Sequence, residues 1–196
     1  AVPQDLKFEG ENSLLEIGDH TIVREYCTLN RGTKASMTTK IGAHCLLMAY
    51  VHVAHDCFVG NHVILANNVN LAGHIDIGDH AILGGLTAVH QFVKIGAHVM
   101  VGGGSLVTKD IPPFAKAARE PLIYEGVNAI GLRRRGFQKE QIDRIHEIYR
   151  YLFIKYRNIT KAVNMIREEL PESEEKTVIL EFIQGSNRGI MKGHRR

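Results

Sequence analysis

The chain has 196 residues, with 24 Lys and Arg against 21 Asp and Glu, and a formal net charge of +3. This near balance of charge does not indicate a nucleic-acid-binding protein, and no apolar run reaches the roughly 18 residues that suggest a membrane-spanning helix. The polar stretch 1–10 does not resemble a signal peptide. Cys27, Cys45 and Cys57 lack the close spacing of a zinc site, so we expect reduced core residues of a cytoplasmic protein.

The N-terminal part is expected to be a loop over residues 1–13, followed by a regular pattern over residues 14–31. Residues 32–39 break the pattern and are predicted to loop out. Apolar residues of the first patterned stretch already share the phase of the later repeat: Ile17, Val23 and Leu29. Because a solenoid needs its end coil covered, we expect N-terminal coils of a longer protein to precede residue 1.

A strict period of six organises residues 41–112. The aliphatic sixth positions are Ile41, Leu47, Val53, Val59, Leu65, Leu71, Ile77, Leu83, Val89, Ile95, Val101 and Val107. Neither a helix nor an alternating strand has this period, whereas a parallel β-helix with three flat faces per coil does. The residue after each is often small, as at Gly42 and Gly60, which we expect to tolerate the corner geometry. About four coils of about 18 residues follow, ended by Pro112-Pro113.

The C-terminal part is predicted to be helical, because apolar residues recur there at spacings of three and four. The three segments run over residues 142–156, 162–170 and 178–183. We expect Thr160 to cap the second helix and Pro171 to stop it, and Ser173 and Gly185 to begin and end the third. The predicted fold is therefore mainly β. Its parts are a β-helix over residues 1–115, an irregular connector over 116–135 and a small α-helical domain over 136–196.

The eleven histidines fall mostly into two groups, because residues 18 apart in such a helix lie directly above one another. The first group is a ladder at one corner: His44, His62, His80 and His98. These side chains are expected to face solvent and to be structural.

The second group consists of His55, His74 and His90, which lie within a residue or two of one vertical line. That line also holds Asp56, Gly73 and Gln91, and His52 lies close to the same corner. Imidazole and carboxylate side chains occupy positions at which the repeat elsewhere prefers small residues. A neutral imidazole, with a pKa of about 6.5, can act as a general base near neutral pH. The second group is therefore the candidate catalytic site.

The segments HVAHDC, AGH, AVHQF and GLRRRGF together resemble the UDP-N-acetylglucosamine acyltransferases that open lipid A synthesis. The resemblance covers nearly the whole chain and includes QDLKFEGE, IPPF and SNRGI. It implies a left-handed β-helix homotrimer with active sites between neighbouring subunits. The implied reaction transfers a 3-hydroxyacyl group from acyl carrier protein to the 3-hydroxyl of UDP-N-acetylglucosamine. It implies no metal and no cofactor beyond the phosphopantetheine arm of the carrier.

The resemblance also implies roles for individual residues. His55 is matched with the general base, Asp56 with its orienting partner, and the Gly73 backbone N–H with the oxyanion donor. The positions matched with substrate contacts are Asp5, Lys7, His52, His74, His90, Gln91, Asn128, Arg134 and Arg135. The last three are matched with the nucleotide phosphates, for which the arginine fork is suited. Gly103 and Pro121 are matched with the acyl-chain groove, and the missing side chain at Gly103 favours a long chain.

The chain departs from the family pattern at Ile130, where an acidic residue near the nucleotide is expected, and at Asn30, which replaces a frequent histidine. A basic C-terminal part is predicted to lie beside Arg133–Arg135. It could dock the acidic carrier protein or simply be solvated. Its residues are Arg188, Lys192, Arg195 and Arg196.

Three alternatives remain open from the sequence. A zinc enzyme similar to γ-class carbonic anhydrases has the same fold, and this chain has histidines to spare. The related N-acyltransferase of the lipid A pathway shares the repeat, but should lack the QDLK and GLRRRGF segments. A non-catalytic scaffold is the third, because solenoids often only bind partners.

Overall fold

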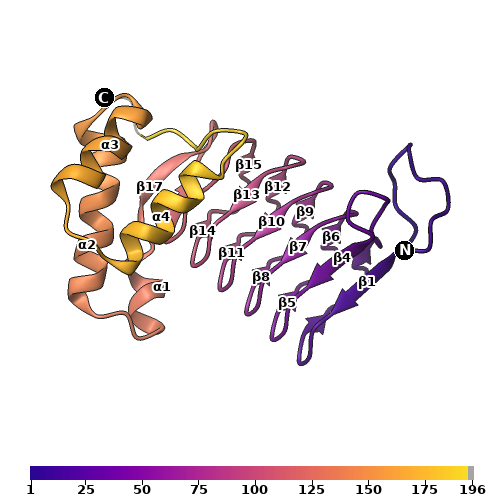
Figure 1. The fold of residues 1–196 in the computed structure, drawn as a ribbon. Helices are drawn as coiled ribbons and strands as arrows, with labels where there is room; N and C mark the ends of the chain where they lie inside the picture. The colour runs from indigo at the N-terminus through magenta and orange to yellow at the C-terminus, as the bar shows by residue number, and fades with distance from the viewer. Residues whose placement is uncertain (194–196) are drawn as a thin grey trace.

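The chain forms a three-sided β-helix that ends in a group of helices, as a computed structural model describes it for residues 1–193 (Figure 1). Its repeat strands are β1 (Leu14–Ile17), β2 (Ile22–Val23), β3 (Thr28–Leu29), β4 (Thr38–Ile41), β5 (Leu46–Leu47), β6 (His52–Val53), β7 (Phe58–Val59), β8 (Ile64–Leu65), β9 (Asn70–Leu71), β10 (Asp76–Ile77), β11 (Ile82–Leu83), β12 (Ala88–Val89), β13 (Lys94–Ile95), β14 (Met100–Val101) and β15 (Leu106–Val107). The fold class predicted from the sequence, a left-handed parallel β-helix with a small helical part, is confirmed.

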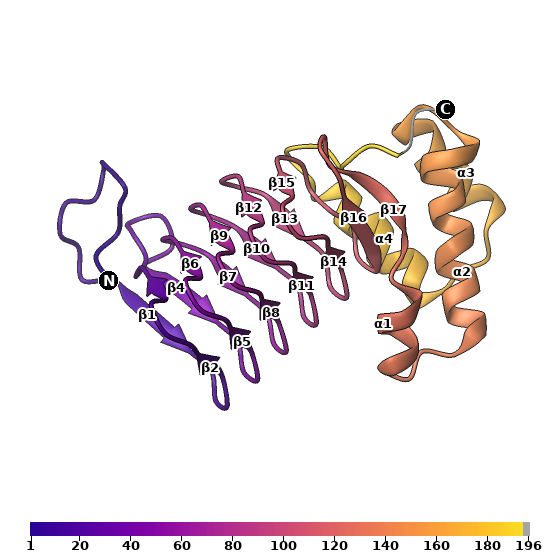
Figure 2. The same cartoon turned by 180° about the vertical axis from the view of Figure 1, so that it is seen from behind.

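Successive strands occupy successive faces of the prism. We call the three sheets A (β1-β4-β7-β10-β13), B (β17-β16-β14-β11-β8-β5-β2) and C (β15-β12-β9-β6-β3), where β16 is Ala115–Ala118 and β17 is Ile123–Val127. The chain passes from sheet A to B to C and back to A, so the prism has an A–B edge, a B–C edge and a C–A edge. The same cartoon seen from behind shows the repeated coils side by side (Figure 2).

The predicted inward positions form the core from Ile41 onward, where every sixth residue of the series is buried. Their stacking removes apolar surface from water along the whole prism, at roughly 25 cal/mol per Å². The first coil differs, because Ile17 is 44% exposed and Val23 is 41% exposed. No coil lies beneath these side chains in this chain, so the inward direction does not bury them.

At most corners the residue that turns the chain is in the left-handed region. It is not the small residue directly after the aliphatic position, as the sequence suggested. His62, Asn68 and His74 have φ of 56°, 60° and 60°. Gly42 and Gly60 lie two positions before such residues, and they are needed for a different reason. A Cβ at Gly42 would lie 2.5 Å from the carbonyl oxygen of Gly60. The small residues therefore allow close stacking of coils, and the expectation that they tolerate the corner itself was wrong.

The segment expected to be an irregular connector contains regular structure. Strand β16 (Ala115–Ala118) pairs in parallel with β14 and antiparallel with β17 (Ile123–Val127). Helix α1 (Ala129–Arg134) follows at once, with Asn128 as its N-cap. The prolines at 112–113 thus do not end sheet B, because the chain rejoins it two residues later.

Within residues 1–193, four helices cover one end of the prism (Figure 1). They are α2 (Lys139–Arg150), continued by a π-helical turn (Tyr151–Lys155), α3 (Ile159–Glu169) and α4 (Glu174–Gln184), after α1. Ser173 caps α4 and Gly185 ends it, as predicted. The cap of α3 is Asn158, whose side chain accepts from the Lys161 N–H, so the prediction of Thr160 was wrong. In the described part of the chain, no helix is sufficiently long and apolar to traverse a bilayer.

The final described residues return to the β-helix and fasten the helices to it. Met191 N–H donates to the Asp110 carbonyl, and Ile190 bridges Asp110. The buried Asp110 carboxylate accepts from Ser186 Oγ at 2.6 Å and from the Lys94 N–H at 2.8 Å. The C-terminal end of the prism is thereby covered by its own chain.

The first histidine group stacks along the A–B edge as a ladder. Neighbouring rings of His44, His62, His80 and His98 have centroids 4.7–4.9 Å apart, and His20 extends the stack below His44. His98 is half-buried against Phe114 and Phe137. Burial, with the nearby His80 and Arg135 adding to it, lowers the pKa of His98 to about 4.

We predict that His98 makes folding sensitive to acid. Because its pKa is lower in the folded chain than the ordinary value of 6.5, unfolding takes up a proton below that pH, and stability falls as the pH drops from about 6.5 towards about 4. The melting temperature should fall less steeply with pH across this range for His98→Asn than for the wild type. Asparagine is chosen because it accepts the left-handed corner. His44→Asn, at an exposed rung, is the matched control. Equal acid sensitivity of wild type and His98→Asn would contradict the prediction.

Candidate active site

The second histidine group gathers along the C–A edge, in two adjacent columns. Asp56 and His74 turn the corner of successive coils with φ of 58° and 60°, and Phe92 occupies the same corner one coil further on. Its ring stacks on His74 with centroids 4.6 Å apart. His55 immediately precedes Asp56, and Gly73 immediately precedes His74, so these two residues also lie one above the other.

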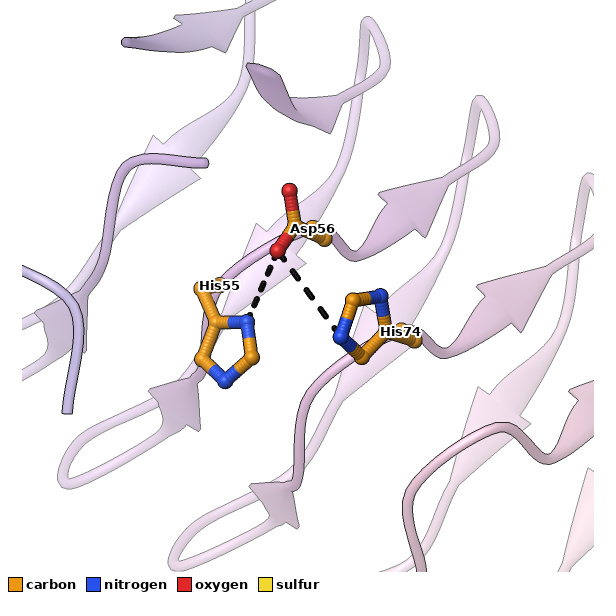
Figure 3. A group of neighbouring side chains, drawn as sticks. All are labelled: His55, Asp56 and His74. Atoms are coloured by element: carbon orange, nitrogen blue, oxygen red, sulfur yellow. Dashed lines mark hydrogen bonds and ion pairs between the residues drawn. The ribbon is translucent and has the colours of Figure 1, made fainter. Parts of the chain in front are cut away.

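His55 and Asp56 form a hydrogen-bonded pair. The His55 Nδ1 atom lies 2.8 Å from Asp56 Oδ2, and His74 Nε2 lies 3.9 Å from the same oxygen (Figure 3). Adjacent side chains on a flat strand point to opposite faces, and the left-handed conformation of Asp56 is what brings its carboxylate beside the preceding ring. The arrangement leaves His55 Nε2 as the ring nitrogen that can meet a substrate, since Nδ1 faces Asp56.

Asp56 is buried and its carboxylate is saturated with donors. Oδ1 accepts from the Thr33 N–H at 2.9 Å and from Ser36 Oγ at 2.5 Å, and Oδ2 accepts from Thr33 Oγ1 at 2.6 Å. Burial alone would raise the pKa of Asp56, but the hydrogen bonds from Ser36, Thr33 and His55 hold it well below the ordinary value. Asp56 is therefore a fixed anion that can orient the His55 ring and stabilise its protonated form.

Gly73 is the residue that makes room for the His55 ring. A Cβ built on Gly73 would lie 2.6 Å from His55 Cε1 and 2.7 Å from Nε2. The sequence suggested that glycine keeps the approach to the backbone amide open. The structure adds a steric reason inside the chain, because any other residue would push the imidazole out of its place.

His52, His90 and Gln91 flank these columns. His52 lies on the strand β6 in register with Asn70, and its Nδ1 is 2.7 Å from Thr28 Oγ1. Burial lowers the pKa of His52. His90 and Gln91 are exposed just after β12, at the C–A edge, and Gln91 lies in the column of His55 and Gly73. His90 and Gln91 thus lie at the same edge as the candidate site, and His52 lies on the strand that leads to it; their contacts with substrate stay a prediction.

The N-terminal segment reaches the same edge. The Ala1 amino group donates to Leu29 O, and buried Asn30 donates to the Val2 carbonyl at 2.8 Å. Asn30 lies beneath Ala54 in the next coil, next to His55. Asp5 and Lys7 lie in this segment, where the Asp5 carboxylate accepts from the Lys7 N–H at 3.0 Å.

The residues matched with the nucleotide phosphates lie at a different edge. Asn128 donates to the His98 carbonyl at 2.9 Å, and Arg135 donates to the His80 carbonyl at 3.1 Å, so both belong to the A–B edge. Arg135 Nη1 is buried and has no hydrogen-bond partner within residues 1–193, and burial lowers the pKa of Arg135. Arg134 and Ile130 are exposed on α1. The described chain therefore does not bring these residues together with His55.

The residues matched with the acyl-chain groove lie toward the helical end. Gly103 is at the B–C edge between β14 and β15, and Pro121 is exposed in the turn between β16 and β17. A Cβ on Gly103 would lie 3.0 Å from the Gly85 carbonyl, so close packing of coils also favours glycine there. Gly103 therefore lies at a different edge from His55, and its predicted place in an acyl-chain groove stays a prediction.

His55, Asp56 and His74 are also the described group with the spacing to hold a metal ion, since one ligand atom from each lies within 4.8 Å of the others. The ligand atoms of a tetrahedral zinc site are separated by about 3.3 Å. Nδ1 of His55 and Oδ2 of Asp56 are 2.8 Å apart, which is a hydrogen-bond separation. The geometry thus fits a His–Asp proton pair better than the zinc site considered from the sequence.

Sequence reasoning missed Thr33, Ser36 and Phe92. Phe92 stands 18 residues after His74 and could have been found by applying the same period. Thr33 and Ser36 lie in the stretch that breaks the repeat. They could have been found from the length of this coil. Paired residues of β1 and β4 are 24 positions apart in the sequence, as Ile17 and Ile41 are, whereas paired residues of later coils are 18 apart. The extra residues are those that enclose Asp56.

Comparison with known families gives two matches within the chain. The family described as "Udp N-acetylglucosamine O-acyltransferase; Domain 2" matches residues 110–191. The family described as "Bacterial transferase hexapeptide (six repeats)" matches residues 38–73. The two matches thus fall on part of the prism and on the segment that runs from its last coil through the helices.

Similar proteins carry the same description along nearly the whole chain. The acyl-[acyl-carrier-protein]–UDP-N-acetylglucosamine O-acyltransferase of Chlorobaculum tepidum is 59% identical over 193 residues, 97% of this chain and 73% of the relative. That of Sulfurihydrogenibium sp. is 57% identical over 190 residues, 96% of this chain and 70% of the relative. The solved UDP-N-acetylglucosamine acyltransferase of Bacteroides fragilis 9343 superposes with a TM-score of 0.96 at 47% identity, covering 98% of this chain and 75% of that one.

We predict that Gly73→Ala displaces the His55 ring. The added methyl would lie 2.6 Å from the ring, so the imidazole must turn away from Asp56, and overpacking should lower the free energy of unfolding by about 1–3 kcal/mol. A crystal structure of the variant, with thermal unfolding, checks both effects. Gly185→Ala is the matched control, because its Cβ would make only an ordinary 3.4 Å contact. An unmoved His55 ring in Gly73→Ala would refute the steric role.

Proposed function

The chain belongs to the UDP-N-acetylglucosamine O-acyltransferase family, and on this basis we propose how its residues carry out the transfer. The activity is acyl transfer from acyl carrier protein to UDP-N-acetylglucosamine, the first step of lipid A synthesis. In our proposal the donor is a 3-hydroxyacyl thioester and the acceptor is the 3-hydroxyl of the sugar. The observation that carries the mechanism is the His55–Asp56 pair, buried on one side and accessible at the other.

We propose His55 as the general base. A sugar hydroxyl is a weak nucleophile until a base takes its proton as it attacks the thioester carbonyl. His55 Nε2 takes that proton, while Nδ1 donates to the ionised Asp56 at 2.8 Å. The positive charge that develops on the ring is stabilised by the carboxylate beside it. When the tetrahedral intermediate collapses, the same proton passes to the departing thiolate of the carrier arm.

The Gly73 amide is suited to stabilise the oxyanion. Among residues 1–193 it makes no hydrogen bond, although the flanking Ala72 and His74 amides both donate to the neighbouring coils. It lies against the His55 ring, so the carbonyl oxygen of a thioester attacked beside His55 would come within its reach. A preorganised backbone donor at this position typically contributes about a hundredfold to a thousandfold in rate.

A second copy of the chain is proposed to complete the site. His55 lies at the C–A edge and Arg135 at the A–B edge, so one prism cannot offer both to a single sugar nucleotide. The buried and unpartnered Nη1 of Arg135 suits a phosphate oxygen. Asn128, Arg134 and Arg135 of one copy would then hold the diphosphate beside His55 of the next, in a homotrimer.

The outer surface of sheet B supports this assembly. In each of the strands β5 to β15 the first residue points outward, because the second is buried. In sheet B these outward residues pair in one unbroken column: Ile22, Leu46, Ile64, Ile82 and Met100. The corresponding column of sheet A contains Lys40, Asp76 and Lys94. An aliphatic column of this kind is suited to burial against another subunit rather than to contact with water.

The acyl carrier protein is proposed to approach the helical end of the prism. Lys109 is exposed there and Arg188 is half-buried, and Lys109 Nζ donates to the Arg188 carbonyl. Arg195 and Arg196, which contribute to the predicted basic tail, lie outside the described residues. Gly103 and Pro121 lie toward the same end, so the proposed acyl groove would lead from the carrier to the site. No cofactor is proposed beyond the carrier's arm.

We place the reaction in the cytoplasm. Cys27, Cys45 and Cys57 are all free thiols in this structure. Reduced cysteines fit a compartment in which thiols stay reduced.

We expect His55→Ala to abolish the transfer and Asp56→Asn to impair it. Removal of the base should lower kcat about a hundredfold or more, with KM for UDP-N-acetylglucosamine little changed. Asp56→Asn keeps the shape but removes the anion that fixes the ring, so kcat should again fall while the fold is kept. A transfer assay with UDP-N-acetylglucosamine and 3-hydroxyacyl carriers of several lengths measures both. Near wild-type turnover by His55→Ala would require another base.

We expect two inactive variants to complement each other when they assemble together. In every mixed trimer of His55→Ala and Arg135→Ala chains, one of the three sites combines an intact His55 with an intact neighbouring Arg135. Co-expression with two affinity tags, followed by the transfer assay, should recover about that share of wild-type activity. Mixed trimers of His55→Ala and Asp56→Asn are the matched control, because both changes lie at the same edge. No recovery in the first pair would exclude a shared site.

A further inference from the structure

The loop between β3 and β4 encloses the carboxylate of Asp56. Thr33 Oγ1 donates to Oδ2 at 2.6 Å, and Ser36 Oγ donates to Oδ1 at 2.5 Å. The Thr33 and Ser36 amides add bonds of 2.9 and 3.3 Å to Oδ1. The Asp56 N–H in turn donates to Thr39 Oγ1 at 2.8 Å. The carboxylate is thus held from a neighbouring coil on both of its oxygens.

The loop is itself fixed on its outer side. Ser13 Oγ donates to the Gly32 carbonyl, and the Lys34 N–H donates to Glu11 Oε1 at 2.8 Å. Thr33 is buried, whereas Lys34 is exposed and its side chain pairs with Glu9. The extra residues of this coil therefore form a rigid support, with two hydroxyls directed at one buried carboxylate.

The loop determines which of two histidines, His55 or His74, the Asp56 carboxylate contacts. Oδ2 of Asp56 lies 2.8 Å from His55 Nδ1 and 3.9 Å from His74 Nε2. A carboxylate free to turn about its Cβ–Cγ bond could swing toward His74, because the difference is little more than one ångström. Thr33 Oγ1 shares Oδ2 with His55, and Ser36 Oγ holds Oδ1 on the other side. Together they fix the plane in which Asp56 meets His55.

We infer that the hydroxyls of Thr33 and Ser36 are positioning residues for the acyl transfer, which direct Asp56 to His55 rather than to His74. They do not touch the substrate, and they act through Asp56 on the orientation of the base. This inference rests on the proposed role of His55. It assigns a catalytic purpose to the coil between β1 and β4. Among the coils of sheet A from β1 to β13, this is the one that is longer than 18 residues.

The test removes the hydroxyls and keeps the volume of the side chains as far as possible. Thr33→Val and Ser36→Ala, singly and together, leave both backbone donors in place. We expect the double variant to lose roughly tenfold to a hundredfold in kcat, because misplacement of a catalytic group by about 1 Å can cost a hundredfold. The KM for UDP-N-acetylglucosamine should stay within about twofold, as expected when an interaction serves the transition state alone.

Spectroscopy and conservative variants separate positioning from folding. The downfield proton resonance of the His55 Nδ1–H, identified by its absence in His55→Ala, should shift or broaden in the double variant. Thr33→Ser and Ser36→Thr restore the hydroxyls and should restore both kcat and the resonance. Lys34→Ala is the matched control within the loop, because its side chain does not contact Asp56, and it should behave as the wild type.

The outcomes distinguish this inference from the proposed function. If His55→Ala is inactive while the hydroxyl-free double variant keeps wild-type kcat and the same resonance, the positioning role is wrong and the base assignment stands. If His55→Ala stays active, both fail. A double variant that loses thermal stability but keeps kcat at a permissive temperature would show a structural role only and would also overturn the inference.

Discussion

The structure depends on the fixed register between coils. The coils place a left-handed residue at most corners, as at His62, Asn68 and His74, and parallel pairing sets like positions above one another. A left-handed conformation is unfavourable for most residues with a side chain, so a single such corner would be costly. Repetition changes this, because the hydrogen bonds and ring stacking of one corner are reinforced by those above and below it. Columns of identical geometry are the result, and both histidine groups are such columns.

The two columns differ in what surrounds them. At the A–B edge the imidazoles stack on each other and end on Phe114 and Phe137, so burial dominates and the His98 pKa falls. At the C–A edge one position in the column is Asp56, and a neighbouring loop supplies it with donors. An imidazole beside this fixed anion can take up a proton with its positive charge stabilised. The same residue type therefore serves packing at one edge and proton transfer at the other.

Much of this could be predicted from the sequence, because the period of six and the stacking distance of 18 are both visible there. They gave the faces, the core from Ile41 onward, and the proximity of His55, Asp56 and Gly73. What could not be predicted has a physical cause in each case. The donors to Asp56 come from residues outside the period, and the contact between Gly73 and the His55 ring depends on the rotamer of a side chain. Asn158 and Thr160 are both good helix caps, so local sequence could not choose between them.

The placement of His55 and Arg135 at different edges connects assembly with catalysis in the proposed trimer. Each chain would contribute its C–A edge to one site and its A–B edge to another, with the aliphatic column of sheet B between subunits. Burial of that column would stabilise the fold by mass action and would at the same time set the distance between base and phosphate site. A change in the column would then alter stability and turnover together, whereas a change in the loop at Thr33 and Ser36 would act on turnover through Asp56. Surface exposure in a single chain is thus a poor guide here, because the residues that look least protected would be those on which the completed site depends.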